Sequence, residues 1–211
     1  MVGTGFTQEG LTLTYPTVDV LSEMSWRKGP ILDLDKWFEE YSIRRYGRRN
    51  PFAVQAWKVL YPEVFNSPNS DTSNVLTQLP NFNMTDDIAY NKTAVVKGWG
   101  LIATAAEKDP DIVKQETFRF DLVDITRQFL ANHATVIYNL VTKAFEDKNL
   151  VELKEHSKSF LELLDDMEKI LKTDRHFMLG PLLEAAKKIG TNEAEKELLE
   201  FNARIQVSQY F

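Results

Sequence analysis

The chain contains no cysteine and only three histidines, and both shortages exclude classes of protein site. Without cysteine the chain forms neither disulfides nor thiolate metal sites. His133, His156 and His176 are isolated along the chain, and none pairs with acidic residues at the helical spacing of a zinc or di-iron site. We therefore predict no metal site and no cofactor.

Long apolar runs and strong positive charge are also missing. No stretch of about twenty apolar residues is present, so the sequence predicts no membrane-spanning helix and no membrane partner. The first residues, Met1 to Thr4, lack the charged and apolar parts of a signal peptide. A net charge of −6, with no interleaving of aromatic and basic residues, argues against nucleic acid as a partner.

Helix signals dominate what is present. The 211 residues, 43% of them hydrophobic, are enough for one sizeable core or for one core plus a fragment. Asp33 can cap a helix that Gly47 stops in the left-handed conformation, and Asn50-Pro51 begins another that Pro62 should end or kink. Helices are predicted at about residues 16–26, 34–46, 51–61, 93–108, 116–147, 150–171 and 191–205.

The apolar patterns of the later helices predict how they pack. The segment of about 116–147 carries two adjoining apolar stripes, which is typical of a central helix covered on both sides. The segment from Leu150 shows a narrow apolar seam and favours an antiparallel hairpin with it. The last helix should bury the side that carries Ala194, Leu198, Phe201 and Ile205. Because residues 66–89 read as a surface loop and no convincing strand follows Leu13, we expect an all-α bundle of about seven helices.

A glycine-rich segment near the start contains one carboxylate, Glu9, among Gly3, Gly5 and Gly10. Such a segment lets the backbone turn sharply and approach a ligand closely. A flexible N-terminal tail is the alternative, because a single glutamate beside glycines is common and brings no catalytic partner with it. Spacing alone favours the tail.

Motifs spread along the chain favour a ligand-binding loop around Glu9 over a flexible tail. The loop from Val2 to Gly10, the run Arg44-Arg45-Tyr46-Gly47 and the stretch from Asp121 to Gln128 occur in this order. Shorter segments of the same kind are Ser25-Trp26-Arg27-Lys28, Tyr90-Asn91, Phe177-Met178-Leu179-Gly180 and Asn202-x-Arg204-x-Gln206. Together they resemble the α-N-acetylglucosaminidases, glycoside hydrolase family 89, over nearly the whole chain.

The resemblance implies a domain organisation. Residues 1–30 would be the end of a catalytic (β/α)8 barrel, including the Glu9 loop, so the bundle carries a short N-terminal remnant of that barrel. Residues 31–211 would be a helical C-terminal domain, truncated at its C-terminal end and packed beside the barrel. The missing catalytic barrel is then the expected protein partner.

The resemblance also implies a chemistry, the hydrolysis of terminal α-linked N-acetylglucosamine in glycans such as heparan sulfate. A retaining mechanism uses two carboxyl groups about 5–5.5 Å apart. Glu9 aligns with the nucleophile, and the acid/base residue belongs to the missing barrel sequence, so the chain alone is expected to be inactive. Gly5 and Trp26 are the candidate substrate-binding residues.

Two Asn-x-Ser/Thr sequons, at Asn83 and Asn91, fall in or beside the loop-like stretch. A sequence of this length holds roughly one by chance. Because the family's enzymes are lysosomal or secreted glycoproteins, the resemblance favours glycosylation at Asn91 and then at Asn83. It likewise implies a location in the lysosome or vacuole, or outside the cell.

Other charged and aromatic residues favour structural interpretations. Arg44, Arg45, Arg48 and Arg49 flank a helix end, where the helix dipole favours cations, although they could also meet sulfate groups. The acidic and basic residues Asp121, Asp124 and Arg127 suggest an internal ion pair that orients helices. The tryptophans Trp37, Trp57 and Trp99 are better explained by core packing than by sugar stacking.

A competing hypothesis is a non-catalytic helical interaction or carbohydrate-binding module, in which Glu9 has no chemical role. The two hypotheses predict different surfaces. Part of an enzyme should expose a large apolar face when its barrel is absent, whereas an independent module should have a polar surface.

Overall fold

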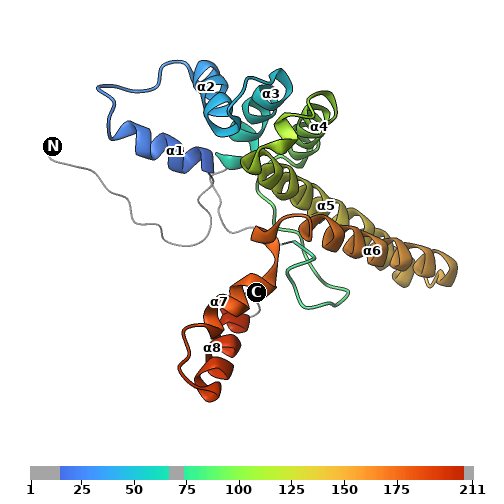
Figure 1. The fold of residues 1–211 in the computed structure, drawn as a ribbon. Coiled ribbons are helices and arrows are strands. Elements are labelled where there is room, and N and C mark those ends of the chain that lie inside the picture. The colour runs from blue at the N-terminus through green and yellow to red at the C-terminus, as the bar shows by residue number, and fades with distance from the viewer. Residues whose placement is uncertain (1–14, 67–73, 207–211) are drawn as a thin grey trace. The chain divides into compact units, whose positions relative to one another are not determined.

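The computed structural model describes residues 15–66 and 74–206. Within these ranges there are eight α-helices and no β-strand, so the predicted all-α class is confirmed (Figure 1). The predicted barrel remnant lies outside the described residues. The helices are α1 (Tyr15–Met24), α2 (Leu34–Tyr46), α3 (Pro51–Leu60), α4 (Lys92–Lys108), α5 (Glu116–Glu146), α6 (Leu150–Leu171), α7 (Leu179–Lys187) and α8 (Glu193–Gln206).

The ends of α2 and α3 follow the local signals in the sequence. The Asp33 side chain accepts a hydrogen bond from the Lys36 amide at 2.9 Å, and Gly47 ends α2 with φ 68°. The Asn50 side chain caps α3 by accepting from two backbone amides. Regular α-helix stops at Leu60, and Pro62 lies in the π-helical turn that follows, Tyr61–Phe65, as expected of a residue without an amide donor.

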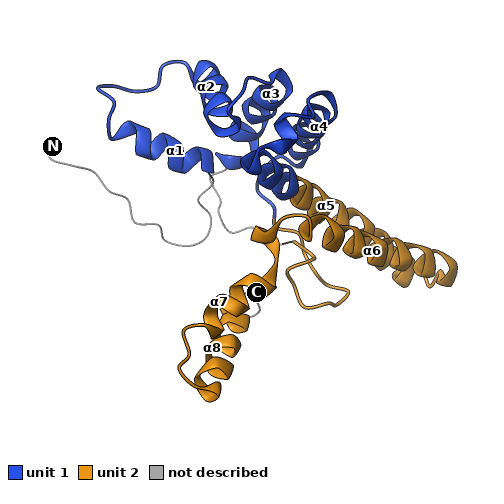
Figure 2. Ribbon diagram, viewed as in Figure 1, with its two compact units in different colours: residues 1–72, 88–125 blue, residues 73–87, 126–211 orange. Residues whose placement is uncertain are grey.

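The chain forms two compact units, each with its own core (Figure 2). Unit 1 comprises residues 1–72 and 88–125, and unit 2 comprises residues 73–87 and 126–211. The long helix α5 therefore contributes its first turns to unit 1 and the rest to unit 2.

The core of unit 1 is largely aromatic and lies among α2, α3, α4 and the start of α5. Trp37 stacks on Tyr41 with ring centroids 5.3 Å apart, and Tyr41 meets the edge of Trp57 at the same distance. Trp37 and Trp57 are fully buried and Trp99 packs against this cluster, so the core interpretation of these three tryptophans is confirmed.

The core of unit 2 includes part of the predicted surface loop. Val75 is buried with Ala134 and Tyr138 of α5 and with Leu163 of α6. The Tyr138 hydroxyl also accepts a hydrogen bond from the Met84 amide at 2.9 Å. Residues 74–87 are thus irregular in backbone, as expected, but they are fastened to the helices rather than lying free on the surface.

The pairing of α5 with α6 agrees only in part with the predicted pattern. The two helices lie side by side, joined by a short turn in which Lys148 has φ 55° (Figure 1). Toward the C-terminal end of α5, however, Val136 and Leu140 are exposed. Neighbours therefore cover both sides of this helix only along its earlier turns, because α6 packs on one side of the later ones.

The last two helices depart most from expectation. The sequence predicts no helix at 179–187, yet α7 forms there with Gly180 and Pro181 in its first turn, where a proline needs no amide donor. The predicted buried side of α8 is exposed, since Leu198 and Phe201 keep 58% and 59% of their surface accessible. The prediction was wrong because α8 packs against α7, and one neighbouring helix covers only one side.

Candidate functional site

Only one of the three predicted substrate-site residues lies in the described part of the chain. Glu9 and Gly5 fall outside it. Trp26 lies in the turn directly after α1, and 90% of its surface is exposed. Its indole is therefore available to a ligand or a partner and takes no part in the core.

The densest buried polar cluster joins two motifs that lie far apart in the sequence. Arg45 binds Asp121 through two hydrogen bonds, from Nε to Oδ2 at 2.5 Å and from Nη2 to Oδ1 at 2.6 Å. The Tyr46 hydroxyl donates to Asp121 Oδ2 at 2.7 Å and accepts from the Trp57 indole nitrogen at 2.9 Å. The Asp121 side chain is only 3% exposed, so this carboxylate is held entirely by protein donors and not by bulk water.

Local structure explains why these groups meet. Arg45 and Tyr46 are the last residues of α2, directly before the left-handed Gly47, while Asp121 lies in the second turn of α5. Phe118, one turn earlier in α5, packs against the Tyr46 ring at 5.2 Å. This contact between Phe118 and Tyr46 therefore fixes the position of α5 relative to α2 at which the Asp121 carboxylate meets its hydrogen-bond donors.

The electrostatics of the cluster favour a fixed ion pair. Burial alone would lower the pKa of Arg45, but the hydrogen bonds and negative charge of Asp121 outweigh it and raise the pKa above its ordinary value. Burial raises the pKa of the Asp121 carboxyl, and the Arg45 guanidinium and the Tyr46 hydroxyl act against that rise. Burial also raises the pKa of Tyr46 well above 10.0, so its hydroxyl keeps its proton and remains a donor.

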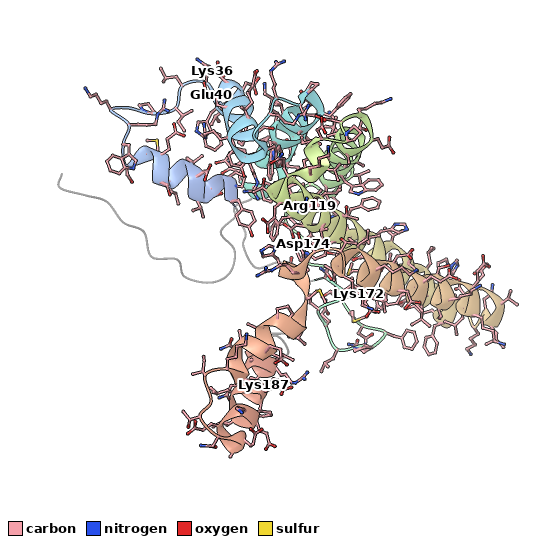
Figure 3. The ribbon with its side chains drawn as sticks, viewed as in Figure 1. Lys36, Glu40, Arg119, Lys172, Asp174 and Lys187 are labelled. Atoms are coloured by element: carbon pink, nitrogen blue, oxygen red, sulfur yellow. The ribbon has the colours of Figure 1, made fainter. Side chains whose placement is uncertain are left out.

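The cluster is thus structural, and the same holds for the neighbouring arginines. Each arginine of the 44–49 segment has a carboxylate of unit 1 within 4 Å, which agrees with the interpretation that they stabilise the fold. The pairs are Arg44 with Glu23 at 3.8 Å, Arg48 with Asp109 at 3.0 Å, and Arg49 with Glu39 at 2.7 Å. Most other ion pairs are exposed helix-surface pairs such as Lys36 with Glu40 on α2, whose contribution to stability is small (Figure 3).

Both ends of α1 are fastened to unit 1. At its start, the Tyr15 ring lies under the Arg45 guanidinium, with 4.7 Å from Cζ to the ring centroid, and meets the edge of Phe120. Near its end, Glu23 accepts a hydrogen bond from the Trp37 indole at 2.5 Å and also pairs with Arg27. The predicted domain boundary at residue 30 remains a prediction, but α1 packs with the helices that follow that boundary.

Sequence reasoning missed Tyr15 and Glu23 as anchors of α1. Their partners on α2 and α5 are distant in sequence, and no local pattern links them. The sequence contains a signal only for the partner side of these contacts. Arg45 and Asp121 each belong to a motif of the resembled family, but the motifs do not show that the two residues meet.

The two sequons lie in different settings. The Asn91 side-chain oxygen caps α4 by accepting from the Thr93 and Ala94 amides, and its Nδ2 donates to Glu63 at 3.2 Å. Asn83 lies exposed in the loop, where its backbone amide donates to the Asn81 side chain. Glycosylation of either residue stays a prediction.

Neither a metal-binding cluster nor a membrane-spanning helix is found among the described residues. No group of three or more histidine, cysteine, aspartate or glutamate side chains in residues 15–66 and 74–206 is arranged to hold a metal ion. Among the helices of these ranges, none combines the length and the apolar character that crossing a membrane requires.

Solved structures of a bacterial enzyme share this fold. The family 89 glycoside hydrolase from Clostridium perfringens, in complex with 2-acetamido-1,2-dideoxynojirmycin, gives a TM-score of 0.81 at 26% identity, covering 91% of this chain and 23% of that one. The same enzyme, with two glutamates replaced by glutamine and in complex with its substrate GlcNAc-α-1,4-galactose, gives a TM-score of 0.80 at 27% identity, over 90% and 22% of the two chains. The fold is therefore that of part of a family 89 glycoside hydrolase.

Sequence comparison specifies the part. The family described as "Alpha-N-acetylglucosaminidase (NAGLU) C-terminal domain" matches residues 37–210. Alpha-N-acetylglucosaminidase of Homo sapiens is 32% identical over 213 residues, which cover 99% of this chain and 28% of the human protein. The chain belongs to the alpha-N-acetylglucosaminidase C-terminal domain family, as its motifs led us to expect, and it spans 28% of the length of this human relative.

Proposed function

We propose that this chain is part of a retaining glycoside hydrolase that removes terminal α-linked N-acetylglucosamine from heparan sulfate or related glycans. The observation that carries the proposal is the 32% identity to human alpha-N-acetylglucosaminidase across 99% of the chain. A match over 99% of the chain leaves at most a few residues uncovered, so Glu9 lies within its length. The C. perfringens relative was captured with its substrate after two glutamates were changed to glutamine, which fits a mechanism based on two carboxyl groups.

In this proposal Glu9 attacks the anomeric carbon and forms a covalent glycosyl-enzyme intermediate. The second carboxyl group first protonates the leaving oxygen and then activates the water that releases the sugar. As the resemblance to family 89 implies, that acid/base residue is supplied by the barrel. Asp121, the most deeply buried carboxylate described in this chain, is bound to Arg45 and Tyr46 and is no candidate for the role. The chain alone is therefore expected to be inactive.

Apolar exposure favours this proposal over an independent, non-catalytic module. In unit 1, Leu21 and Met24 of α1 and the nearby Leu32 are exposed together with Trp26. In unit 2, the apolar side of α8 is exposed as well. Patches of this kind are uncommon on domains that stand alone and typical of surfaces that bind a partner. We infer that the partner is the catalytic barrel.

The test is the release of a chromophore from an aryl N-acetyl-α-glucosaminide. The chain is assayed alone and mixed with a polypeptide that contains the barrel, with Glu9→Gln as the matched variant. We expect activity only in the mixture, and a loss of about 10³-fold or more with Glu9→Gln, because the amide cannot form the covalent intermediate. Full activity of the Glu9→Gln mixture would remove Glu9 from the mechanism. Inactivity of a mixture shown to form a stable complex would favour the non-catalytic module.

Three finer assignments belong to the same proposal. Gly5 and Trp26 contact the sugar, the latter through an indole whose faces are open to solvent. The enzyme acts in the lysosome or vacuole, or after secretion. Asn91 and then Asn83 carry glycans, and a glycan on Asn91 Nδ2 leaves Oδ1 free to keep its capping bonds to α4. Mass spectrometry of the protein from a eukaryotic secretory host, before and after enzymatic deglycosylation, tests the two glycans.

A further inference from the structure

Two exposed phenyl rings of unit 2 lie beside one of the two sequons. Phe82 in the loop stacks on Phe145 of α5, with ring centroids 4.0 Å apart and planes at 8°, and the residue after Phe82 is Asn83. We propose that a glycan on Asn83 packs its first N-acetylglucosamine over this pair of rings, the Phe82–Phe145 stack. The inference rests on the glycosylation of Asn83 that the proposed function includes.

The Phe82–Phe145 stack is open to solvent although both side chains are apolar. Phe82 keeps 45% of its surface accessible and Phe145 keeps 49%. Because each ring covers one face of the other, the accessible surface lies on the outer faces and the edges. Phenyl pairs prefer an offset or edge-on arrangement with more widely separated centroids, so contact between the two rings alone does not account for this geometry. An apolar group over the outer faces would stabilise the stack.

The loop that carries the sequon is fixed on α5. A single hydroxyl, that of Tyr138, donates to the Asn81 carbonyl at 3.1 Å and accepts from the Met84 amide at 2.9 Å. The Asn83 amide donates to the Asn81 side chain at 2.7 Å, which tightens the turn between these residues. Tyr138 and Phe145 are seven residues, about two helical turns, apart on α5, so the loop and the ring of Phe145 lie on the same side of the helix.

The side chain of Asn83 is placed to carry a sugar beside the stack. Adjacent Cα atoms are about 3.8 Å apart, so a sugar linked to Nδ2 of Asn83 begins next to the ring of Phe82. Asn83 is exposed, and none of the described residues exchanges a hydrogen bond with its side chain. At the other sequon, Nδ2 of Asn91 donates to Glu63. Nothing comparable restrains a glycan on Asn83 from turning toward the rings.

The chemistry of this surface suits a sugar. The faces of a phenyl ring are electron-rich and attract the weakly positive C–H groups that line one face of a pyranose. Residues 74–85 carry no charged side chain, and Asn81 and Thr85 are exposed there as neutral polar groups that match the hydroxyls of a sugar. Two half-exposed rings are also a small patch beside the roughly 800 Å² that each partner buries in a protein interface of standard size.

The test uses a polypeptide that contains both the barrel and this chain, secreted from a eukaryotic host. Hydroxyl-radical labelling read by mass spectrometry gives the rate at which Phe82 and Phe145 are modified, and the same spectra report the glycan on Asn83. Thr85→Ala removes the sequon and leaves the backbone bonds between Thr85 and Gln78 in place. We expect both rings to be labelled at least about twofold faster in Thr85→Ala, because the sugar no longer covers their outer faces. Thr85→Ser keeps the sequon and should keep the wild-type rates.

The matched control is Thr93→Ala, which removes the other sequon. The cap on α4 uses the Asn91 side chain and backbone amides, so it survives this substitution. Both rings should be labelled as in wild type, because a glycan on Asn91 is not attached beside either of them. A second arm trims the wild-type glycans with an endoglycosidase that leaves the first N-acetylglucosamine on asparagine. The rings should then stay protected, since that sugar makes the contact.

The outcomes separate the inference from the proposed enzymatic activity. Equal labelling of glycosylated wild type and Thr85→Ala would overturn the inference. Fast labelling of both would mean that the glycan extends into solvent, and slow labelling of both would mean that protein covers the stack. Fast labelling after trimming, or an Asn83 that carries no glycan, would overturn it as well. The activity itself is tested in the same preparations by the aryl N-acetyl-α-glucosaminide assay with Glu9→Gln, whose result does not depend on the labelling of the rings.

Discussion

Asp121 is the residue at which two motifs of the chain meet, the run from Arg44 to Gly47 and the stretch from Asp121 to Gln128. A buried carboxylate is costly unless donors replace the water it has lost, and here a bidentate guanidinium and a tyrosine hydroxyl do so. Removing one partner of such a pair destabilises the fold by more than the intact pair stabilises it, because the remaining charge stays buried without compensation. The Arg45–Asp121 pair is therefore the most sensitive polar contact among the described residues.

Asp121→Asn should destabilise the chain by about 3 kcal/mol, since Arg45 then faces a neutral amide that can no longer bind it as a carboxylate does. Urea unfolding followed by circular dichroism measures the change. Asp111→Asn is the matched control, because the exposed Asp111 pairs with Arg48 and Lys114 in water, and its unfolding midpoint should not move measurably. Equal midpoints for the two variants would show that the buried pair does not hold α2 to α5.

Glu23 predicts a dependence of stability on pH. The hydrogen bond from Trp37, helped by Arg27 and Arg44, holds the pKa of Glu23 below its ordinary value despite some opposing burial. A carboxyl whose pKa is lowered by folding stabilises the protein above the unfolded pKa, and this contribution is lost as the pH falls through the folded pKa.

Wild type should therefore be more stable than Glu23→Gln at neutral pH, and the difference should shrink as the pH falls from about 5 to about 3. Melting temperatures recorded across that range measure it. A difference that stays constant with pH would mean that Glu23 acts through packing alone.

At the scale of elements, helices α3 and α4 approach closely at a glycine. A Cβ atom added to Gly98 would lie 2.5 Å from Cγ and Cδ2 of Leu60, a side chain fully buried in the core of unit 1. Gly100, two residues further along α4, has nothing within 4 Å of the same position. The two glycines therefore differ in what a methyl group would meet.

Gly98→Ala should destabilise the chain by about 1–3 kcal/mol through overpacking, whereas Gly100→Ala should stabilise it by up to about 1 kcal/mol through higher helix propensity. Both values come from denaturant unfolding under the same conditions. The opposite sign for either variant would contradict the close approach of α3 and α4.

Some elements could be predicted from the sequence because their causes are local. The caps at Asp33 and Asn50 and the stop at Gly47 depend on a few neighbouring residues, so their ends fall where expected. The buried side of α8 could not be predicted. Its apolar stripe shows only that this side of the helix is suited to a partner, and α7 packs against a different side. Helix α7 was missed because Gly180-Pro181 interrupts helices in most positions other than the first turn.

At the scale of the whole molecule, exposed apolar side chains predict how strongly the isolated chain binds a hydrophobic dye. The double substitution Leu198→Gln and Phe201→Gln should lower the binding of a hydrophobic dye to the isolated chain without lowering its melting temperature. Leu183→Gln on α7 is the contrasting variant, because Leu183 is buried and its loss should unfold the α7–α8 hairpin. A fall in stability for the double variant would mean that this side of α8 is covered within the chain.

The candidate site was predictable to a lesser degree than the fold. Glu9 could be proposed because its motif resembles that of a known family, and spacing by itself favoured a tail. The anchor at Tyr15 could not be proposed, because it depends on Arg45 and Phe120, which the fold alone brings to that ring. Contacts between residues that lie far apart in the sequence are the part of the fold that a single sequence does not reveal.

The continuity of α5 has a consequence for recombination between related genes. Its 31 residues run without interruption across the boundary between the two units at residues 125 and 126. A chimera joined at that boundary would inherit the first turns of α5 from one parent and the remaining turns from the other, so Ile125 and Ala134 would come from different lineages. Crossovers in the connections before Glu116 or after Glu146 would keep the helix whole, so viable hybrids should accumulate there.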